Sequence, residues 1–363
     1  MSAIESTQDA VSLLDVQKAL DRIRPFVHKT PVITSSTIDK LAPQGCGRVF
    51  MKCENLQKVG AFKFRGATNA ILSLIASPSE SADSSLPLAV VTHSSGNHAQ
   101  ALALAAREQS LRAHIIMPSN APSVKQDAVR GYGAAVTLCE PTLEARETTA
   151  AAAMKQEAAE GRRVEFIAPY DDVRVIAGQG TMALELLDQA KELLADSNGE
   201  LDILITPVGG GGMLSGCALA AKGTDPDIKV FGAEPLGVDD AQKSFRSKKF
   251  VPAGPPNTIA DGLLTSLGDI TFPLILKYVD DVFTVTEDQI IAALKLSFER
   301  LKMVIEPSAA VSLAVVLFSS EFASFVAKLS AEKGRLLNVG IVFSGGNVEL
   351  AKVLSLLTSS RST

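Results

Sequence analysis

The chain has 363 residues, of which 46% are hydrophobic and 21% charged, so it can form a substantial core and, by length, two or three domains. Its formal net charge of −5 argues against nucleic-acid and anionic-membrane partners, because both need concentrated Lys and Arg. We therefore expect a small-molecule partner, no nucleic acid and no membrane.

The N-terminal stretch MSAIESTQDAVSLLDV is polar and acidic, whereas a secretory signal needs a basic start and an apolar run. We expect no targeting segment there and a cytoplasmic location. Apolar runs are interrupted before the ~20 residues that span a bilayer. The cysteines lie far apart and form no metal-type spacing with the histidines, so neither a disulfide scaffold nor a zinc site is expected.

Strand-like apolar runs alternate with helical stretches from residue 88 onward. LAVVTH precedes a predicted helix over 97–108, AHIIMP and AAVTLCE follow, and a second helix is predicted over 145–160. The same rhythm returns in ILITPV, IKVFGAEP and LLNVGIVF. This alternation is typical of parallel sheets covered by helices, so we predict an α/β fold with two units. The Ser- and Pro-rich residues 76–87 read as a surface linker between them.

One lysine has unusual neighbours. In VGAFKFRGATNA, Lys63 stands between Phe62 and Phe64. A lone lysine is usually a surface cation. Apolar surroundings, however, favour the neutral amine, which is a nucleophile able to form an imine.

Three further segments lie where a predicted strand ends. SSGNH, residues 94–98, opens a helix whose free N–H groups suit an anion, although an ordinary N-cap explains part of it. Four glycines, residues 209–212, precede Met213 in a strand-to-helix turn and match no nucleotide-binding signature. Their amides suit a phosphate, with a flexible turn as the alternative. Ser344 follows the last strand and precedes two glycines. A nucleophilic lysine, an anion loop, a phosphate loop and a serine together point to pyridoxal phosphate.

These segments resemble the fold-type II pyridoxal-phosphate family, in particular its group of serine racemases and serine/threonine dehydratases. The resemblance rests on ENLQKVGAFKFRGA, SSGNHAQA, IAGQGT, VGGGGMLSG, AEP, TIADG, IEPSAA and SGGN, in family order over almost the whole chain. It implies a tryptophan synthase β-like fold of two three-layer α/β/α domains with mainly parallel sheets. We expect a large domain of residues 1–77 and 169–363, a small domain of 88–168 and a linker of 78–87.

The resemblance also implies the residues of the cofactor site. Lys63 would bind the cofactor as an imine and then act as a base on one face, and Ser344 would meet the pyridine nitrogen. Asn97 would hydrogen-bond the phenolic oxygen, and the glycine loop would hold the phosphate. The implied cofactor-binding residues are Phe62, Lys63, Asn97, Gly209, Gly210, Gly211, Gly212, Met213, Glu306 and Ser344.

A second implied set binds the substrate. Ser95 would be the acid/base on the face opposite Lys63, where dehydratases of the liver type carry alanine, so a two-base racemisation is expected. Tyr170 stands where mammalian members have asparagine and is similar to fungal dehydratases. The implied substrate-binding residues are Ser94, Ser95, Asn97, His98, Arg146 and Tyr170.

Two further ligand sets follow from the resemblance. Glu234, the Val238 carbonyl and Asp240 match a loop that binds Mg or Ca, although two acids on a loop are common in any protein. An activating ATP between subunits of a homodimer would contact Lys58, Gln100, Tyr132, Lys302 and Asn347. Val59 departs from the threonine that mammalian members have beside that site.

The sequence therefore predicts a pyridoxal-phosphate enzyme that racemises serine and dehydrates L-serine or L-threonine to a 2-oxo acid and ammonia. The alternative within the same class is a dedicated threo-3-hydroxyaspartate or L-threonine dehydratase with little racemase activity. A non-enzymatic nucleotide sensor on the same fold is the alternative from another class.

Overall fold

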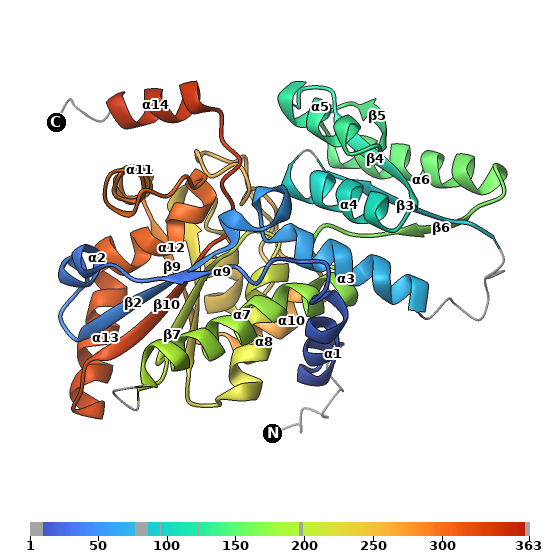
Figure 1. The fold of residues 1–363 in the computed structure, drawn as a ribbon. Coiled ribbons are helices and arrows are strands. Elements are labelled where there is room, and N and C mark those ends of the chain that lie inside the picture. The colour runs from blue at the N-terminus through green and yellow to red at the C-terminus, as the bar shows by residue number, and fades with distance from the viewer. Residues whose placement is uncertain (1–9, 77–85, 95, 122, 196–198, 360–363) are drawn as a thin grey trace.

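The structure is a computed structural model that describes residues 10–76, 86–94, 96–121, 123–195 and 199–359. Over these ranges the chain forms two parallel-sheet units that lie side by side (Figure 1). The predicted α/β class with mainly parallel sheets is confirmed.

The larger sheet has six strands in the described part of the chain, in the order β1-β2-β10-β7-β8-β9. β1 pairs antiparallel with β2, and the other neighbours pair in parallel. Its strands are β1 (Val32–Ile33), β2 (Cys46–Cys53), β7 (Ile203–Pro207), β8 (Lys229–Pro235), β9 (Asp281–Val285) and β10 (Leu337–Phe343).

Helices cover both faces of this sheet, so most residues of its central strands are buried. In β7, Leu204 packs into one hydrophobic cluster, whereas Ile203 and Ile205 pack into the other, as the two-residue period of a strand requires. The first cluster includes residues of α1 (Leu13–Ile23), α7 (Val173–Leu193), α8 (Gly212–Thr224), α9 (Asp240–Ser247) and α10 (Thr271–Tyr278). The second includes residues of α2 (Ser36–Leu41), α11 (Glu287–Leu296), α12 (Pro307–Phe318), α13 (Ser320–Lys333) and α14 (Leu350–Ser359). Short turns of helix within the described residues are η1 (Glu54–Leu56), η2 (Lys58–Gly60), η4 (Leu236–Val238) and η5 (Ser297–Leu301).

The smaller sheet has the strand order β5-β4-β3-β6 and is parallel throughout. Its strands are β3 (Leu88–His93), β4 (Arg112–Pro118), β5 (Ala135–Cys139) and β6 (Arg163–Phe166), and its helices are α4 (Asn97–Glu108), α5 (Ser123–Gly131) and α6 (Leu143–Ala159). β3 and α4 begin and end where the sequence pattern predicts. β6 was not predicted, because its four residues are only half-buried and show no apolar run.

Helix α3 (Lys63–Ala76) lies between the two units and packs against α4 of one and α7 of the other (Figure 1). Because α3 contacts both units, its packing does not assign it to one of them, and the domain boundaries given above stay a prediction. Residues 78–85 of the predicted linker lie outside the described residues.

Among the residues that the structure describes, no single helix is long and apolar enough to cross a membrane, and only the bent pair of α12 and α13 meets that criterion jointly. Most of α12 is buried beneath the large sheet, as a core helix is.

Candidate active site

A cavity of about 430 Å³ lies where strands of both sheets end. Pro207 ends β7, His93 ends β3 and Ser344 follows β10, so the cavity is at the carboxyl ends of parallel strands, where α/β proteins bind ligands. Predicted site residues that line it are Phe62, Lys63, Ser94, Asn97, His98, Arg146, Tyr170, Gly209, Gly210, Gly211, Gly212, Met213, Glu306 and Ser344. Ser95 lies outside the described residues.

Lys63 begins α3 and lines the cavity. Its Nζ donates a hydrogen bond of 2.6 Å to the carbonyl of Pro169 and lies 5.2 Å from the centre of the Phe62 ring. Burial lowers the pKa of Lys63 to about 8, and the nearby Glu306 carboxylate opposes part of that shift. The backbone N–H of Phe62 donates to the carbonyl of Ser344, which joins the start of α3 to the end of β10. With a pKa of about 8, about a tenth of the Lys63 amine is neutral at pH 7.

Glu306 is a buried carboxyl group immediately before α12. Burial raises its pKa to about 7, although the side chain of Asn97 donates hydrogen bonds of 3.0 and 3.2 Å to its two oxygens. The amide oxygen of Asn97 accepts a hydrogen bond of 2.8 Å from Asn347 Nδ2. Asn97, predicted to contact the cofactor, thus joins Asn347, predicted to contact a nucleotide, to the carboxyl group in the cavity.

The glycine loop, residues 209–212, connects β7 to α8. Gly211 has φ of 88°, a left-handed conformation that favours glycine. A Cβ on Gly210 would lie 2.4 Å from the ring of Tyr170, and one on Gly212 would lie 2.8 Å from the carbonyl oxygen of Tyr170. Glycine is therefore favoured at 211 by its backbone conformation, and at 210 and 212 because a side chain there would collide with Tyr170.

Two supports hold the loop in this shape. The Thr271 hydroxyl donates a hydrogen bond of 2.8 Å to the carbonyl of Gly210, and the Ser215 hydroxyl donates one of 2.8 Å to the carbonyl of Gly211. The Asp171 carboxylate, next to Tyr170, accepts hydrogen bonds from the backbone of residues 269–271 and so fixes the start of α10. With these carbonyls engaged, the loop amides and the N-terminus of α8 are available to an anion.

The predicted substrate residues in the described part of the chain also line the cavity. His98 is 2% exposed, and neither ring nitrogen has a hydrogen-bond partner among the described residues. Burial, with a smaller contribution from the Lys63 charge, lowers the pKa of His98 to about 3, so the ring is neutral. Burial raises the pKa of the Tyr170 phenol. Arg146 reaches the cavity from α6 and supplies a cation there.

These groups fit pyridoxal phosphate. The loop amides suit its phosphate, the Lys63 amine suits its aldehyde, and the two unpartnered nitrogens of His98 suit a polar ligand. A tight glycine loop with left-handed backbone is what a phosphate group needs for close approach.

In the predicted metal loop, residues 234–240, the carboxylate of Glu234 is engaged in hydrogen bonds within the protein. The Glu234 carboxylate accepts hydrogen bonds of 2.9 Å from the backbone of Ala241 and of Gln242, and so caps α9. Burial raises the pKa of Glu234, and burial likewise raises that of Asp240 to about 6. Over the described part of the chain no group of three or more His, Cys, Asp or Glu side chains could hold a metal ion.

Most of the predicted nucleotide residues already have protein partners. Lys58 pairs with Glu108 at 2.7 Å, and Lys302 donates to the carbonyl of Glu299. Tyr132 lies 5.4 Å beneath the Arg107 guanidinium. Gln100 is buried in α4.

Sequence reasoning missed several cavity residues. Asp261 and Gly262 line it, and the N–H of Gly262 donates a hydrogen bond of 2.9 Å to the hydroxyl of Ser308. The carbonyl of Pro169, which accepts from Lys63, was also missed. The segment TIADG contains Asp261 and Gly262, and the segment IEPSAA contains Ser308, so these two segments could have pointed to the three residues. A backbone carbonyl leaves no mark in a sequence.

Comparison with known proteins agrees with the fit of this cavity to pyridoxal phosphate. The family model described as "Pyridoxal-phosphate dependent enzyme" matches residues 23–324. The serine racemase of Dictyostelium discoideum is 47% identical over 350 residues, which are 96% of this chain and 98% of that protein. Its crystal structure has a TM-score of 0.80 and covers 94% of this chain and 99% of that one. A T.th. threonine deaminase structure is 37% identical, with a TM-score of 0.78 and coverage of 93% and 99%.

Proposed function

This chain belongs to the family of pyridoxal-phosphate-dependent enzymes, and we propose that it racemises serine and dehydrates L-serine and L-threonine to the 2-oxo acid and ammonia. Similarity to serine racemases over nearly the full chain supports the racemase activity, and similarity to a threonine deaminase supports the dehydratase activity. The observation that carries the proposal is a lysine amine with lowered pKa in the same cavity as the glycine loop.

The cofactor would be held by the loop amides at its phosphate, by Lys63 at its aldehyde, and by Asn97 and Ser344 along the ring. When bound, pyridoxal phosphate supplies an electron-withdrawing ring that acidifies the α C–H bond of the amino acid. Asn97 donates a hydrogen bond to the Glu306 carboxyl group, and both residues line the cavity that would hold the cofactor. The Ser344 hydroxyl would meet the pyridine nitrogen of the cofactor as a neutral group, which would leave that nitrogen largely unprotonated. The ring would then withdraw electrons less strongly, which favours prompt loss of the β-hydroxyl of the substrate.

Proton transfer is assigned to two groups. Lys63 Nζ, whose pKa is lowered by burial, would in its neutral form accept the α-proton on one face of the substrate. The Ser95 hydroxyl is proposed as the acid/base on the opposite face. Ser94, Asn97 and the neutral ring of His98 would bind the substrate carboxylate.

The test is to incubate purified holoenzyme with L-serine and measure D-serine and pyruvate together. Both products are expected from the wild type and neither from Lys63→Ala. Ser95→Ala should suppress D-serine far more than pyruvate, because elimination needs only the Lys63 face. Equal loss of the two products would contradict the two-base assignment, and no product from the wild type would contradict the function itself.

A dedicated dehydratase acting on threo-3-hydroxyaspartate or L-threonine is the second candidate. Two observations favour it: Arg146 places a cation in the cavity, which suits a second carboxylate, and Tyr170, the residue that is similar to fungal dehydratases, lines the cavity beside Gly210. Such an enzyme would leave residual L-serine without D-serine on chiral analysis, and its kcat/KM would be higher for hydroxyaspartate than for serine.

We also propose a divalent cation, Mg or Ca, on the Glu234 and Asp240 carboxylates with the Val238 carbonyl, because the raised pKa of both acids disfavours two bare charges there.

ATP as activator would need Lys58 and Lys302 to leave their present partners. The exposed side chains of Leu56 and Val304 each lie two residues from one of these lysines in the chain and support a homodimer contact, which sedimentation would test. A cytoplasmic location accords with the sequence.

A further inference from the structure

Helix α7 separates the helix of Lys63 from the helix of the glycine loop. Its IAGQGT segment, residues 176–181, packs against α3 on one side and α8 on the other. A Cβ on Gly178 would lie 2.7 Å from the Cα of Gly66 in α3. A Cβ on Gly216 of α8 would lie 2.9 Å from the backbone nitrogen of Gly180. The three helices therefore touch backbone to backbone, and α7 sets the spacing between Lys63 and the glycine loop.

Contacts between glycines are close, but they carry no side chains that interlock. Ridges that fit into grooves fix the register of two helices, and glycine surfaces provide few such ridges. The N–H of Gly66 donates a hydrogen bond of 3.2 Å to the Gln179 side chain of α7, and a second, ionic restraint stands one residue nearer to Lys63.

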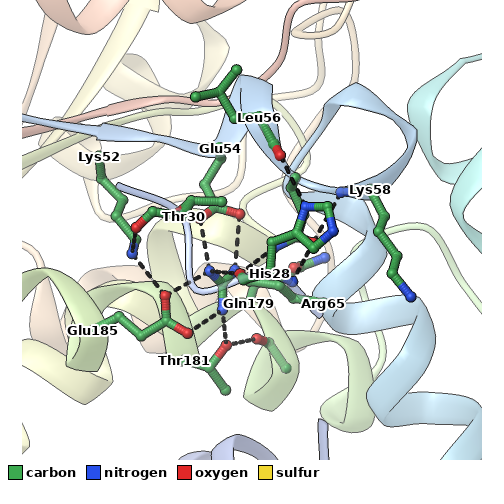
Figure 2. Close-up of polar contacts among 12 residues, drawn as sticks. His28, Thr30, Lys52, Glu54, Leu56, Lys58, Arg65, Gln179, Thr181 and Glu185 are labelled. Carbon is green, nitrogen blue, oxygen red and sulfur yellow. Dashed lines mark hydrogen bonds and ion pairs between the residues drawn. The ribbon is translucent and has the colours of Figure 1, made fainter. Parts of the chain in front are cut away.

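Arg65, two residues after Lys63, supplies that restraint. Its side chain is completely buried, and Figure 2 shows its guanidinium between the carboxylates of Glu54 and Glu185. Nε and Nη2 donate hydrogen bonds of 2.8 Å each to Glu54, and Nη1 and Nη2 donate bonds of 2.9 and 2.8 Å to Glu185. Nη1 also donates to the Thr181 hydroxyl at 3.3 Å. The first turn of α3 is thus joined to the end of β2 and to α7 at once.

A second layer of contacts fixes both carboxylates. The Thr30 hydroxyl donates to Glu54, and the buried Lys52 ammonium lies 2.7 Å from Glu185 (Figure 2). Two cations face two carboxylates, so the buried cluster is neutral as a whole. Planar bidentate geometry on two sides is specific to arginine, and lysine cannot reproduce it.

We propose that Arg65 is a positioning residue: by clamping α3 to Glu54 and Glu185 it sets where the Lys63 amine lies relative to the glycine loop. The proposal rests on the proposed role of Lys63 in holding the cofactor. A residue with only a structural role would alter the stability of the whole protein, whereas a positioning residue alters the cofactor site beyond that change.

The test compares Arg65→Lys holoenzyme with Asp202→Asn, a matched control. Asp202 is also buried and accepts ion pairs from Lys333 and Arg335, but it does not line the cavity. The measurements are Tm, the dissociation constant of pyridoxal phosphate, and the pH at which the visible absorption of the lysine-bound cofactor changes. Asp202→Asn should lower Tm and leave the other two unchanged. Arg65→Lys should weaken cofactor binding at least about tenfold and shift the pH midpoint, since small misplacements of reacting groups are costly.

Thr181→Val gives a second, milder variant that keeps every charge and removes one acceptor of Arg65. It should shift cofactor binding in the same direction by about threefold, the effect of one weak hydrogen bond. If both variants match Asp202→Asn in cofactor affinity and pH midpoint, Arg65 serves stability alone and the proposal is wrong. If the wild type itself shows no visible band with pyridoxal phosphate, the proposed function has failed instead.

Discussion

Replacing Gly210 by alanine is expected to displace the ring of Tyr170. The added Cβ would lie 2.4 to 2.5 Å from three ring atoms, about 1 Å closer than ordinary contact. Overpacking of this kind costs about 1–3 kcal/mol, equivalent to about 5- to 150-fold in binding. Because Tyr170 lines the cavity, its ring has space to rotate, so we expect the lower end of that range for stability.

The assay is a double-mutant cycle with thermal unfolding and pyridoxal-phosphate titration. Gly210→Ala should lower Tm and cofactor affinity, and adding Tyr170→Ala should restore much of both. Gly212→Ala is the matched control, because its Cβ would meet the backbone oxygen of Tyr170 at 2.8 Å, which no side-chain truncation relieves. A Gly210→Ala/Tyr170→Ala protein as impaired as Gly210→Ala would refute the reasoning, since the coupling of the two sites would then be zero.

In cofactor-free protein, modification of Lys63 by an amine-reactive reagent should have its midpoint near pH 8, with about a tenth of the amine neutral at pH 7. Glu306→Gln should move that midpoint lower, because the Glu306 carboxylate raises the pKa of Lys63. Mass spectrometry of labelled peptides measures the midpoint in the wild type and in the variant. A wild-type midpoint near 10.5 would contradict the argument that burial lowers the pKa. Thr271→Val should weaken binding of pyridoxal phosphate about threefold to tenfold and leave pyridoxal unaffected, since it removes the donor to the Gly210 carbonyl, and competition titrations decide this. Mg or Ca should raise the Tm of the wild type and not that of Asp240→Asn; an equal rise in both would place the cation elsewhere.

The local features of this fold could be predicted from the sequence. β3 and α4 have the expected bounds because an apolar run and a helix-start signal stand next to each other. Some predicted residues of the cavity come from short segments that follow strands, such as residues 94–98, 209–212 and Ser344, whereas Phe62, Arg146, Tyr170 and Glu306 were predicted from the family resemblance alone. The sheet order was not predicted, because β2 pairs with β10 from the far end of the chain.

Arg65 shows the limit of that approach. An arginine is expected at the surface unless it is paired, and its carboxylate partners Glu54 and Glu185 come from separate elements. Only the packing of α3 against α7 brings the three together. The partners of Asn97 were missed for the same reason, since Glu306 and Asn347 lie more than 200 residues away.

The small sheet is inserted between α3 and α7, two helices that already touch. At the base of this insertion, Arg163 of β6 donates to the carbonyl of Leu74 in α3, and Asn69 of α3 donates to the carbonyl of Arg174 in α7. Because α3 contacts α4 of the small unit as well as α7, and Lys63 is its first residue, a movement of one sheet relative to the other would reach the amine through the helix that carries it.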